Sequence, residues 1–221
     1  MGKEKNPVTD NFFEEGLHRL GLCQSRISSL LGRYIEEIEL FNPAYKLVKV
    51  KDRRELIVKH IFDSLAPLET LRGLSNETGK IADIGSGAGL PGIPLAICMD
   101  GVEFTLVERM GRRAGFLRDT IAVLGLSNVR VEEAEMEKLW HSSKERFNLI
   151  VFRAFKPLEA RLLKRLLRLL GPGGILAAYK GRRQRIEEEM SVIQWKQAPW
   201  EIIPVEVPFL HEERHLVVIR N

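Results

Sequence analysis

The sequence is poor in the residues that build covalent or metal-stabilised proteins. It has two cysteines in 221 residues, Cys23 and Cys98, which form no C-x-x-C pair. From these and the five histidines we predict neither a disulfide nor a metal site, and free thiols suit a reducing compartment. Long apolar runs are also missing, because Pro91 and Pro94 interrupt the longest one. With a polar, charged start (MGKEKNPVTDNF), this predicts no membrane span, no signal peptide and a cytoplasmic protein.

What is present is enough hydrophobic residues, 44%, for one sizeable core and a small appendage. Residues 8–40 repeat apolar side chains every three or four positions, which predicts two helices broken around Gly21. A further helix is predicted over residues 53–71, with Asp52 as its cap and Gly73 at its end. We therefore expect a helical extension, residues 1–72, packed on a main domain, residues 73–221.

The main domain alternates strands and helices, which predicts a doubly wound α/β fold with a mostly parallel seven-stranded sheet. The last strand follows Pro208 and a loop and is expected to be antiparallel. The predicted strands are residues 80–84, 103–107, 128–132, 147–152, 174–179, 201–207 and 214–220. The predicted helices between them are residues 91–99, 110–124, 157–170 and 183–195.

The most informative stretch is IADIGSGAGLPGIPLAI, residues 81–97, which predicts a buried strand, a glycine-dense turn and a helix. Gly85, Gly87 and Gly89 allow a tight turn and a close approach of a ligand to the backbone. A dinucleotide would place its pyrophosphate at such a turn, but Asp83 puts a carboxylate there, which repels phosphate and attracts a cationic amine. S-adenosylmethionine, with an ammonium, a sulfonium and no phosphate, is the better match.

A second carboxylate supports a nucleoside ligand. Glu108 ends the predicted strand VEFTLV, about 20 residues after the glycine turn, where an acidic side chain can accept hydrogen bonds from ribose hydroxyls. On its own, a glutamate after a strand is usually only solvated, so the spacing from the turn carries the argument.

Several segments together resemble one bacterial family. DIGSGAGLPGIPLAI, FTLVERMGRRAGFL, VEEAE, RAF, YKG and ERHLVVI, with HIFDSL upstream, are similar to the glucose-inhibited division protein B family of small-subunit ribosomal RNA guanine methyltransferases. The similarity runs from about residue 39 to residue 220. It implies a class I, Rossmann-like methyltransferase fold, S-adenosyl-L-methionine as cofactor, and methylation of guanine nitrogen 7 in 16S ribosomal RNA. The candidate cofactor-binding residues are Asp83, Gly85, Gly87, Gly89, Leu90, Glu108, Ala134, Glu135 and Arg153.

Basic residues are concentrated in one part of the chain. Residues 151–185 contain ten Lys or Arg and a single acidic residue, Glu159, which indicates a polyanion-binding surface. A basic helix face at residues 161–168 can also serve solubility alone. The run KGRRQR lies at the expected carboxyl end of the fifth strand, where substrate should enter. The candidate RNA-binding residues are Lys180, Arg182, Arg183, Arg185, Arg214 and His215.

The expected partner is ribosomal RNA or a precursor of the small subunit, bound by a monomer. No catalytic residue is assigned, because guanine nitrogen 7 attacks through a free lone pair and needs no general base.

Two other functions stay open on the residues alone. One is a methyltransferase for a small molecule or a protein, and the other is a non-enzymatic dinucleotide-binding protein.

Overall fold

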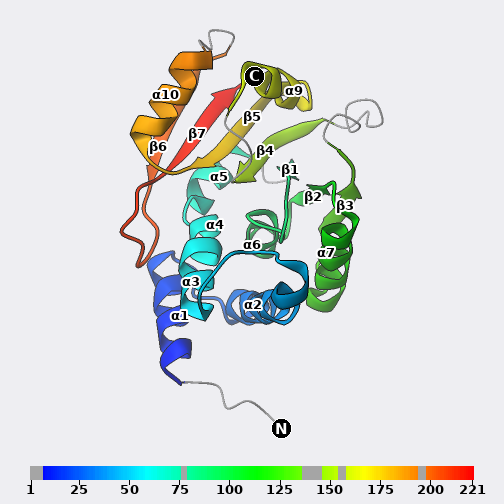
Figure 1. Ribbon diagram of the computed structural model, residues 1–221, viewed down its shortest axis with the longest axis vertical. Coiled ribbons are helices and arrows are strands. Elements are labelled where there is room, and N and C mark those ends of the chain that lie inside the picture. Colours follow the sequence, from blue (N-terminus) through cyan, green and yellow to red (C-terminus); the bar gives the residue numbers. More distant parts are fainter. Residues whose placement is uncertain (1–6, 76–78, 136–145, 154–157, 194–197) are drawn as a thin grey trace.

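The computed structural model describes residues 7–75, 79–135, 146–153, 158–193 and 198–221. It contains one seven-stranded sheet with the order β3-β2-β1-β4-β5-β7-β6. All neighbouring strands are parallel except at β7, which runs antiparallel to both β5 and β6 (Figure 1). The strands are β1 (Lys80–Ile84), β2 (Glu103–Glu108), β3 (Val129–Glu133), β4 (Phe147–Arg153), β5 (Leu170–Lys180), β6 (Trp200–Val205) and β7 (Arg214–Arg220). The predicted doubly wound, mostly parallel fold is therefore confirmed.

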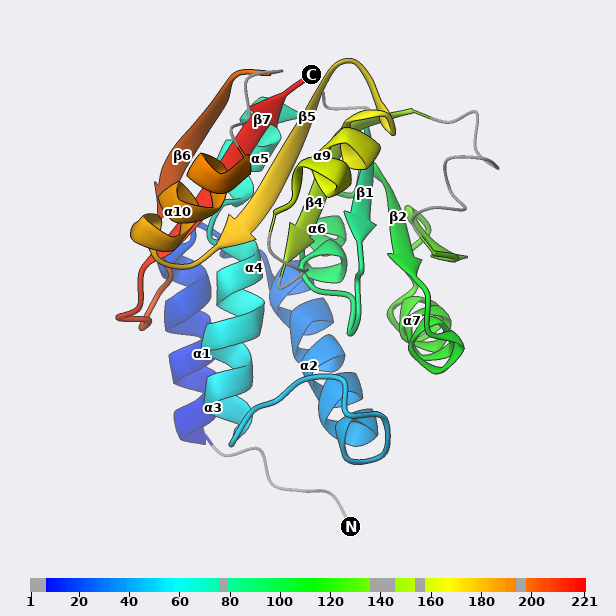
Figure 2. The same ribbon diagram turned by 45° about the horizontal axis from the view of Figure 1, so that its top comes forward.

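Helices cover both faces of the sheet, and the alternation of side chains along each strand decides which face a residue joins. In β1, Ile81 packs with the amino-terminal helices, whereas Ala82 and Ile84 pack with α9 and α10. Figure 2 shows these two helices in front of the sheet and the blue and cyan helices behind it. The helices that follow β1 are α6 (Gly92–Cys98), α7 (Gly111–Leu124), α9 (Ala160–Leu167) and α10 (Arg183–Ile193).

The amino-terminal region forms the predicted helical extension, which we call the helical cap, but its elements differ in detail from the prediction. Its helices are α1 (Pro7–Arg19), α2 (Ser25–Tyr45), α3 (Arg53–Leu56), the π-helix η1 (Ile57–Phe62), α4 (Asp63–Leu65) and α5 (Leu68–Leu74). The predicted break around Gly21 is present, and Asp52 caps α3 by accepting from the Glu55 amide at 2.8 Å. Helix α2 continues past Pro43 to Tyr45, because a proline in the last turn removes only a single helical hydrogen bond, and a short non-helical segment then leads to α3.

Two boundaries in the main domain also differ. The helix predicted over residues 157–170 is α9, which ends at Leu167, and β5 begins at Leu170 instead of residue 174. Leu170 pairs with Phe147, and a register shift follows on β4, so the glycine-rich start of β5 is an irregular part of the strand and not a loop. The ends predicted at residues 157 and 194–195 lie outside the described residues.

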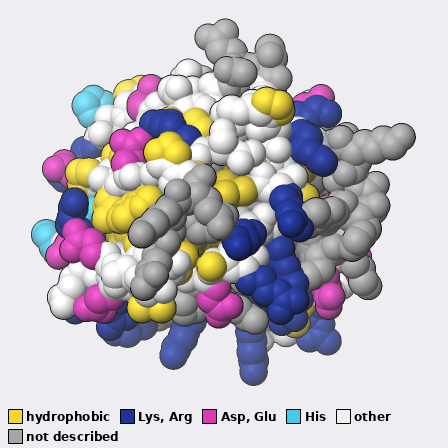
Figure 3. Space-filling view, turned by 90° about the horizontal axis from the view of Figure 1, so that it is seen from above, with side chains coloured by type: hydrophobic (Ala, Val, Ile, Leu, Met, Phe, Trp, Pro, Cys, Tyr) yellow, Lys and Arg dark blue, Asp and Glu magenta, His cyan; other side chains and the backbone are white. Residues whose placement is uncertain are grey.

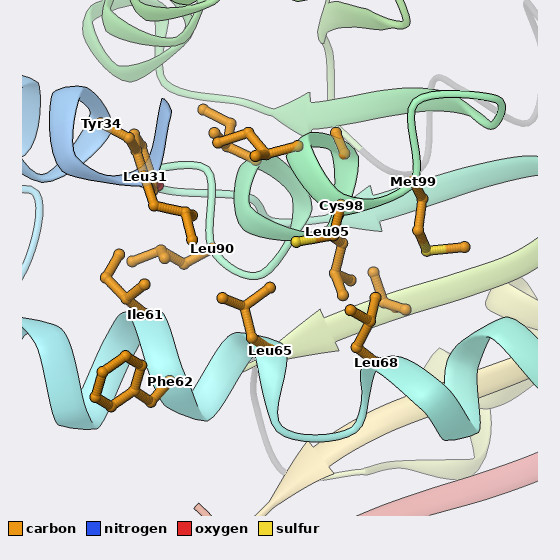
Figure 4. Packing of buried hydrophobic residues seen from close by; sticks show 14 of the residues in the cluster. Leu31, Tyr34, Ile61, Phe62, Leu65, Leu68, Leu90, Leu95, Cys98 and Met99 are labelled. Carbon is orange, nitrogen blue, oxygen red and sulfur yellow. The ribbon is translucent and has the colours of Figure 1, made fainter. Parts of the chain in front are cut away.

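The helical cap and the sheet share one hydrophobic core. Tyr34 from α2, with Leu65 and Leu68 from the helices after η1, points toward Leu90 and Leu95 around the start of α6 (Figure 4). The Tyr34 hydroxyl also donates to the carbonyl oxygen of Ala88 at 2.7 Å, and burial raises the pKa of this tyrosine well above its ordinary value. The cap therefore holds the glycine turn in place. The division at residue 72 stays a prediction.

Candidate functional site

The glycine turn lies at the carboxyl end of β1, in the middle of the sheet. Gly85, Gly87 and Gly89 have φ angles of 75°, 58° and 91°, a region that L side chains rarely adopt. The amides of Gly85 and Ser86 donate to the carbonyl oxygen of Val107 at 2.9 and 3.1 Å. These bonds fix the turn to the end of β2, next to Glu108.

The glycines of this segment serve two different purposes. A Cβ atom on Gly89 would lie 2.5 Å from the Ile93 side chain, and one on Gly92 would lie 2.4 Å from the Leu106 side chain. Those two positions are therefore occupied by close packing. A Cβ atom on Gly87 would have no neighbour closer than 3.9 Å. Gly87 is consequently the position where a ligand can approach the backbone of the turn.

Asp83 lies directly beneath the turn. It is fully buried, and its Oδ2 accepts from the Gly92 amide at 2.9 Å. Its Oδ1 is buried and has no hydrogen-bond partner among the described residues. Burial raises the pKa of Asp83 to about 7, against the opposing effects of the Gly92 hydrogen bond and the Arg153 charge. Beneath the turn there is thus a carboxyl group with one acceptor atom that the described residues leave unpaired.

Glu108 contacts the same turn. Its side chain is nearly buried, Oε2 accepts from the Gly87 amide at 2.9 Å, and Oε1 accepts from the Met110 amide at 2.9 Å. Since a carboxylate has about four acceptor positions, two amide bonds leave it able to bind hydroxyl groups. The spacing of about 20 residues between the glycine turn and Glu108 therefore brings the two into direct contact.

The remaining cofactor candidates lie around this centre at varying distances. Leu90 is buried, and its peptide bond to Pro91 is cis. Ala134 is half-buried and Glu135 is exposed, just after β3 at the same edge of the sheet as Glu108. Arg153 ends β4, on the other side of β1, and belongs to a second group of residues.

That second group surrounds a cavity of about 460 Å³ at the carboxyl ends of β4 and β5. Its volume is in the range of sites that hold small organic ligands. The cap contributes one wall and the β6–β7 hairpin another. The lining residues are Lys59, His60, Asp63, Phe152, Arg153, Tyr179, Lys180, Gly181, Val205, Arg214 and His215.

Asp63 joins two arginines in this cavity. Its Oδ2 accepts from Arg153 Nη1 at 2.9 Å, and its Oδ1 accepts from Arg214 Nε at 2.9 Å. The side chains of Asp63, Arg153 and Arg214 are only 7%, 13% and 21% exposed. The network therefore connects the cap with β4 and β7 away from bulk water, where ion pairs are weakly screened.

Arg153 also contacts the π-helix η1. Its Nη1 donates to the carbonyl oxygens of Lys59 at 3.1 Å and His60 at 3.5 Å, and its Nη2 lies 2.9 Å from His60 Nδ1. His60 and Asp63, three residues apart in the sequence, are therefore both bonded to Arg153. π-helical turns often occur at functional sites. Sequence reasoning missed this turn and the cavity wall formed by Tyr179, whose hydroxyl donates to the Ser64 carbonyl oxygen at 2.9 Å.

Three of the predicted RNA-binding residues, Lys180, Arg214 and His215, line the cavity. The other three, Arg182, Arg183 and Arg185, follow the lining residue Gly181 where α10 begins, and we call the six together the basic rim. Lys180 pairs with Glu189 at 2.7 Å, and Arg183 pairs with Glu187 at 2.8 Å. Arg182 and Arg185 are exposed and have no side-chain partner within the described part of the chain. These two cations are the ones most free to meet a phosphate.

The basic residues of α9 lie elsewhere. This helix packs beside the amino-terminal half of β5, far from the rim (Figures 1 and 2). Figure 3 looks onto the end of the molecule where α9 and the C-terminus lie, and Lys and Arg side chains gather in its lower right part. The basic residues of the segment 151–185 therefore lie at two separate places, and the polyanion-binding surface stays a prediction. Lys156 lies outside the described residues.

A metal site was not predicted, although residues 211–215 spell H-E-x-x-H, which sequence reasoning overlooked. On a helix this spacing puts two histidines on one face, where they can bind zinc. Here His211 lies in a loop and His215 in β7, so the two are not brought together in that way. The described residues contain no group of three or more His, Cys, Asp or Glu that could hold a metal. They also include no helix long and apolar enough to cross a membrane.

Comparison with known proteins identifies the family. Residues 27–217 match the family described as rRNA small subunit methyltransferase G. The chain belongs to this family. It is 35% identical to the ribosomal RNA small subunit methyltransferase G of Treponema denticola, over 98% of this chain and 96% of the relative. It is 41% identical to that of Treponema pallidum (strain Nichols), over 88% and 86%. The resemblance found in the sequence is thereby confirmed.

Solved structures agree on the fold of this methyltransferase. An O-methyltransferase from Bacillus cereus, solved in complex with SAH, has a TM-score of 0.62 against it, at 15% identity over 97% of both chains. The precorrin-6y C5,15-methyltransferase of Geobacter metallireducens has a TM-score of 0.53 at 16% identity, over 80% of this chain and 91% of that one. At such low identities the likeness shows the class I methyltransferase fold alone.

Proposed function

We propose that this chain transfers a methyl group from S-adenosyl-L-methionine to nitrogen 7 of a guanine in 16S ribosomal RNA. The observation that carries the proposal is the arrangement along one edge of the sheet. A glycine turn between two carboxylates, Asp83 and Glu108, lies beside a cation-lined cavity. We expect the protein to act in the cytoplasm, as a monomer and without a metal.

The residues of the turn fit the cofactor. Gly87 leaves space against the backbone, and the unpaired Oδ1 of Asp83 is an acceptor that a cationic amine can satisfy. Glu108 can accept from ribose hydroxyls, while Leu90, Ala134 and Glu135 would border the adenine. When bound, the cofactor supplies a methyl group already activated by a positively charged sulfur. Arg153 adds a positive charge near Asp83 and holds the wall of the neighbouring cavity.

The acceptor needs positioning more than proton transfer. Nitrogen 7 of guanine attacks through a lone pair, and no proton has to leave it before the methyl group arrives. The protein must therefore hold the base in line with the methyl group and leave nitrogen 7 uncovered. Because this atom faces the deep groove of an RNA helix, which side chains cannot read, the target must be unpaired or irregular.

The decisive experiment is mass analysis of digested ribosomal RNA. A strain lacking the gene should lose one 7-methylguanosine from 16S ribosomal RNA, and the purified protein with S-adenosylmethionine should restore it. Thermal stabilisation by S-adenosylhomocysteine but not by NAD should accompany this result. Unchanged methylation in the deletion strain, with stabilisation by NAD, would instead indicate a dinucleotide-binding protein.

The basic rim should bind RNA and not the cofactor. Exchanging Arg182, Arg183 and Arg185 for Gln should weaken binding of 16S ribosomal RNA and lower its salt dependence by up to about 3 phosphate contacts, with cofactor affinity nearly unchanged. Filter binding at several salt concentrations and calorimetry measure the two quantities.

The matched control removes three charges from α9 and its C-cap, by exchanging Arg161, Lys164 and Arg168 for Gln. It changes the net charge equally but far from the rim, so its salt slope should fall less. Equal losses in both triple variants would mean that the rim has no specific role and that only net charge matters.

The rate of methyl transfer should depend little on pH. With saturating cofactor, we expect single-turnover rates to stay within about threefold from pH 6 to 9, because no general base has to ionise. Saturation is needed because protonation of Asp83, whose pKa is about 7, should weaken cofactor binding at the acid end. His215→Gln should keep a substantial part of the rate. A steep acid limb that disappears in this variant would show that a proton is removed, and the acceptor would then not be nitrogen 7.

A further inference from the structure

The contact with Arg153 fixes the protonation state of His60. A guanidinium group has only donors, so the 2.9 Å contact between Arg153 Nη2 and His60 Nδ1 requires Nδ1 to be the acceptor. The ring is therefore neutral, and its proton is on Nε2. Burial, followed by the Arg153 charge, lowers the pKa of His60 to about 4, so this form persists at neutral pH.

His215 is held in the opposite tautomer. Its Nδ1 lies 2.7 Å from the carbonyl oxygen of Gly181, which can only accept, so Nδ1 carries the proton. In its neutral form the ring then offers Nε2 as an acceptor. His60 and His215 line the same cavity. With both rings neutral, the cavity therefore offers one imidazole donor, held by Arg153, and one imidazole acceptor, held by the Gly181 carbonyl oxygen.

The donor on His60 is available to a ligand. Its Nε2 forms no hydrogen bond within the described part of the chain and is not among the buried unpaired atoms there. The ring also cannot turn over freely, because Arg153 is anchored by Asp63 and by two carbonyl oxygens of η1. A fixed, unpaired N–H group at the wall of a cavity is a recognition element for a carbonyl oxygen.

The alternative donors in the cavity are less suitable for this reaction. An arginine that recognises guanine in the usual way donates to oxygen 6 and nitrogen 7 together, and it would cover the lone pair that must react. Both Arg153 and Arg214 are instead held by Asp63. A single imidazole N–H can bind oxygen 6 and leave nitrogen 7 free. Adenine carries an amino group at the corresponding position, so two hydrogen-bond donors would face each other there.

We propose that the Nε2–H group of His60 donates to oxygen 6 of the target guanine and selects guanine over adenine. The proposal rests on the proposed function and assigns the reacting base to the His60–His215 cavity. It makes His60 a specificity-determining residue, and Arg153 and Asp63 positioning residues that act through it.

The test pairs a change in the protein with a change in the base. The substrate is 16S ribosomal RNA joined from fragments, carrying either guanine or 2-aminopurine at the methylated position. 2-Aminopurine lacks oxygen 6 and keeps nitrogen 7. The wild type should methylate guanine roughly 10- to 100-fold faster than 2-aminopurine, the usual discrimination of a good base contact. In His60→Leu this ratio should fall at least about tenfold, because the variant has lost the same contact.

The control is Lys59→Leu, which changes the preceding residue of η1 at the rim of the same cavity and should leave the ratio unchanged. An unchanged ratio in His60→Leu, with a lower rate on both RNAs, would overturn the proposal and reduce His60 to a structural role. Failure of the proposed function is distinct, because no RNA would then be methylated even by the wild type.

A second measurement is made on the wild type and needs no activity assay. Nitrogen-15 spectra of the wild-type histidine rings, with His60 assigned by comparison with His60→Gln, should show the Nε2–H tautomer from about pH 6 to 8. A doubly protonated ring or the Nδ1–H tautomer would overturn the proposal without any kinetic experiment.

Discussion

Replacing Gly87 with valine should abolish binding of S-adenosylmethionine and S-adenosylhomocysteine while the protein stays folded. A Cβ atom at this position would have no neighbour closer than 3.9 Å, so the valine side chain should enter the space that the ligand needs and not the core. The φ of +58° adds strain of about 1 to 2 kcal/mol for an L residue, which a domain of this size should tolerate. Isothermal titration calorimetry measures the affinity, and circular dichroism checks the fold.

Gly125 provides a matched control. Its φ is +67°, and a Cβ atom there would also have no neighbour within 4 Å, but it lies at the end of α7, away from the turn. Gly125→Val therefore carries similar backbone strain without a ligand nearby, and it should keep cofactor affinity. If Gly87→Val binds the cofactor as well as Gly125→Val does, the assignment of the turn is wrong.

The parts of the site that were predictable are those fixed by local sequence. Glycines that must adopt positive φ, and an acidic residue after the next strand, stand at short and regular intervals along the chain. The sheet follows from the same kind of signal, because apolar strands that alternate with amphipathic helices leave few arrangements. Glu108 and Gly87, 21 residues apart, are accordingly in contact.

The cavity was not predictable because its contacts are long-range. Arg153 and Asp63 are 90 residues apart in the sequence, and Arg214 and Asp63 are 151 apart. No periodicity or turn chemistry relates such positions, so the sequence offered Arg153 as a cofactor ligand and Arg214 as an RNA ligand without their common partner. The basic residues of α9 show the opposite effect, because they are near residues 180–185 in the sequence but apart from them in the fold. Residues near each other in sequence are carried apart when a helix runs back along the sheet.

The same long-range network should make Asp63 one of the most sensitive positions in the protein. Asp63→Asn keeps the shape of the side chain but removes the charge that faces both guanidinium groups, so that Arg153 loses its ion pair with Asp63 in a partly buried site and Arg214 keeps only its pair with the exposed Glu212. Removing one partner of a buried ion pair typically costs about 3 kcal/mol or more. We expect the free energy of unfolding to fall by about that amount, measured by urea denaturation. Methyl transfer should fall at least about 100-fold, because Arg153 no longer fixes the His60 ring.

Glu212→Gln separates burial from charge. Glu212 pairs with the same Arg214 at 3.1 Å, but its side chain is 56% exposed, and exposed pairs contribute less than about 1 kcal/mol. This control should therefore lose little stability and little activity. Cofactor affinity should be nearly the same in both variants, because neither residue contacts the glycine turn in the described structure. If Asp63→Asn is as stable and as active as Glu212→Gln, then Arg153 and His60 are held by η1 alone, and the ion pairs are incidental to the site.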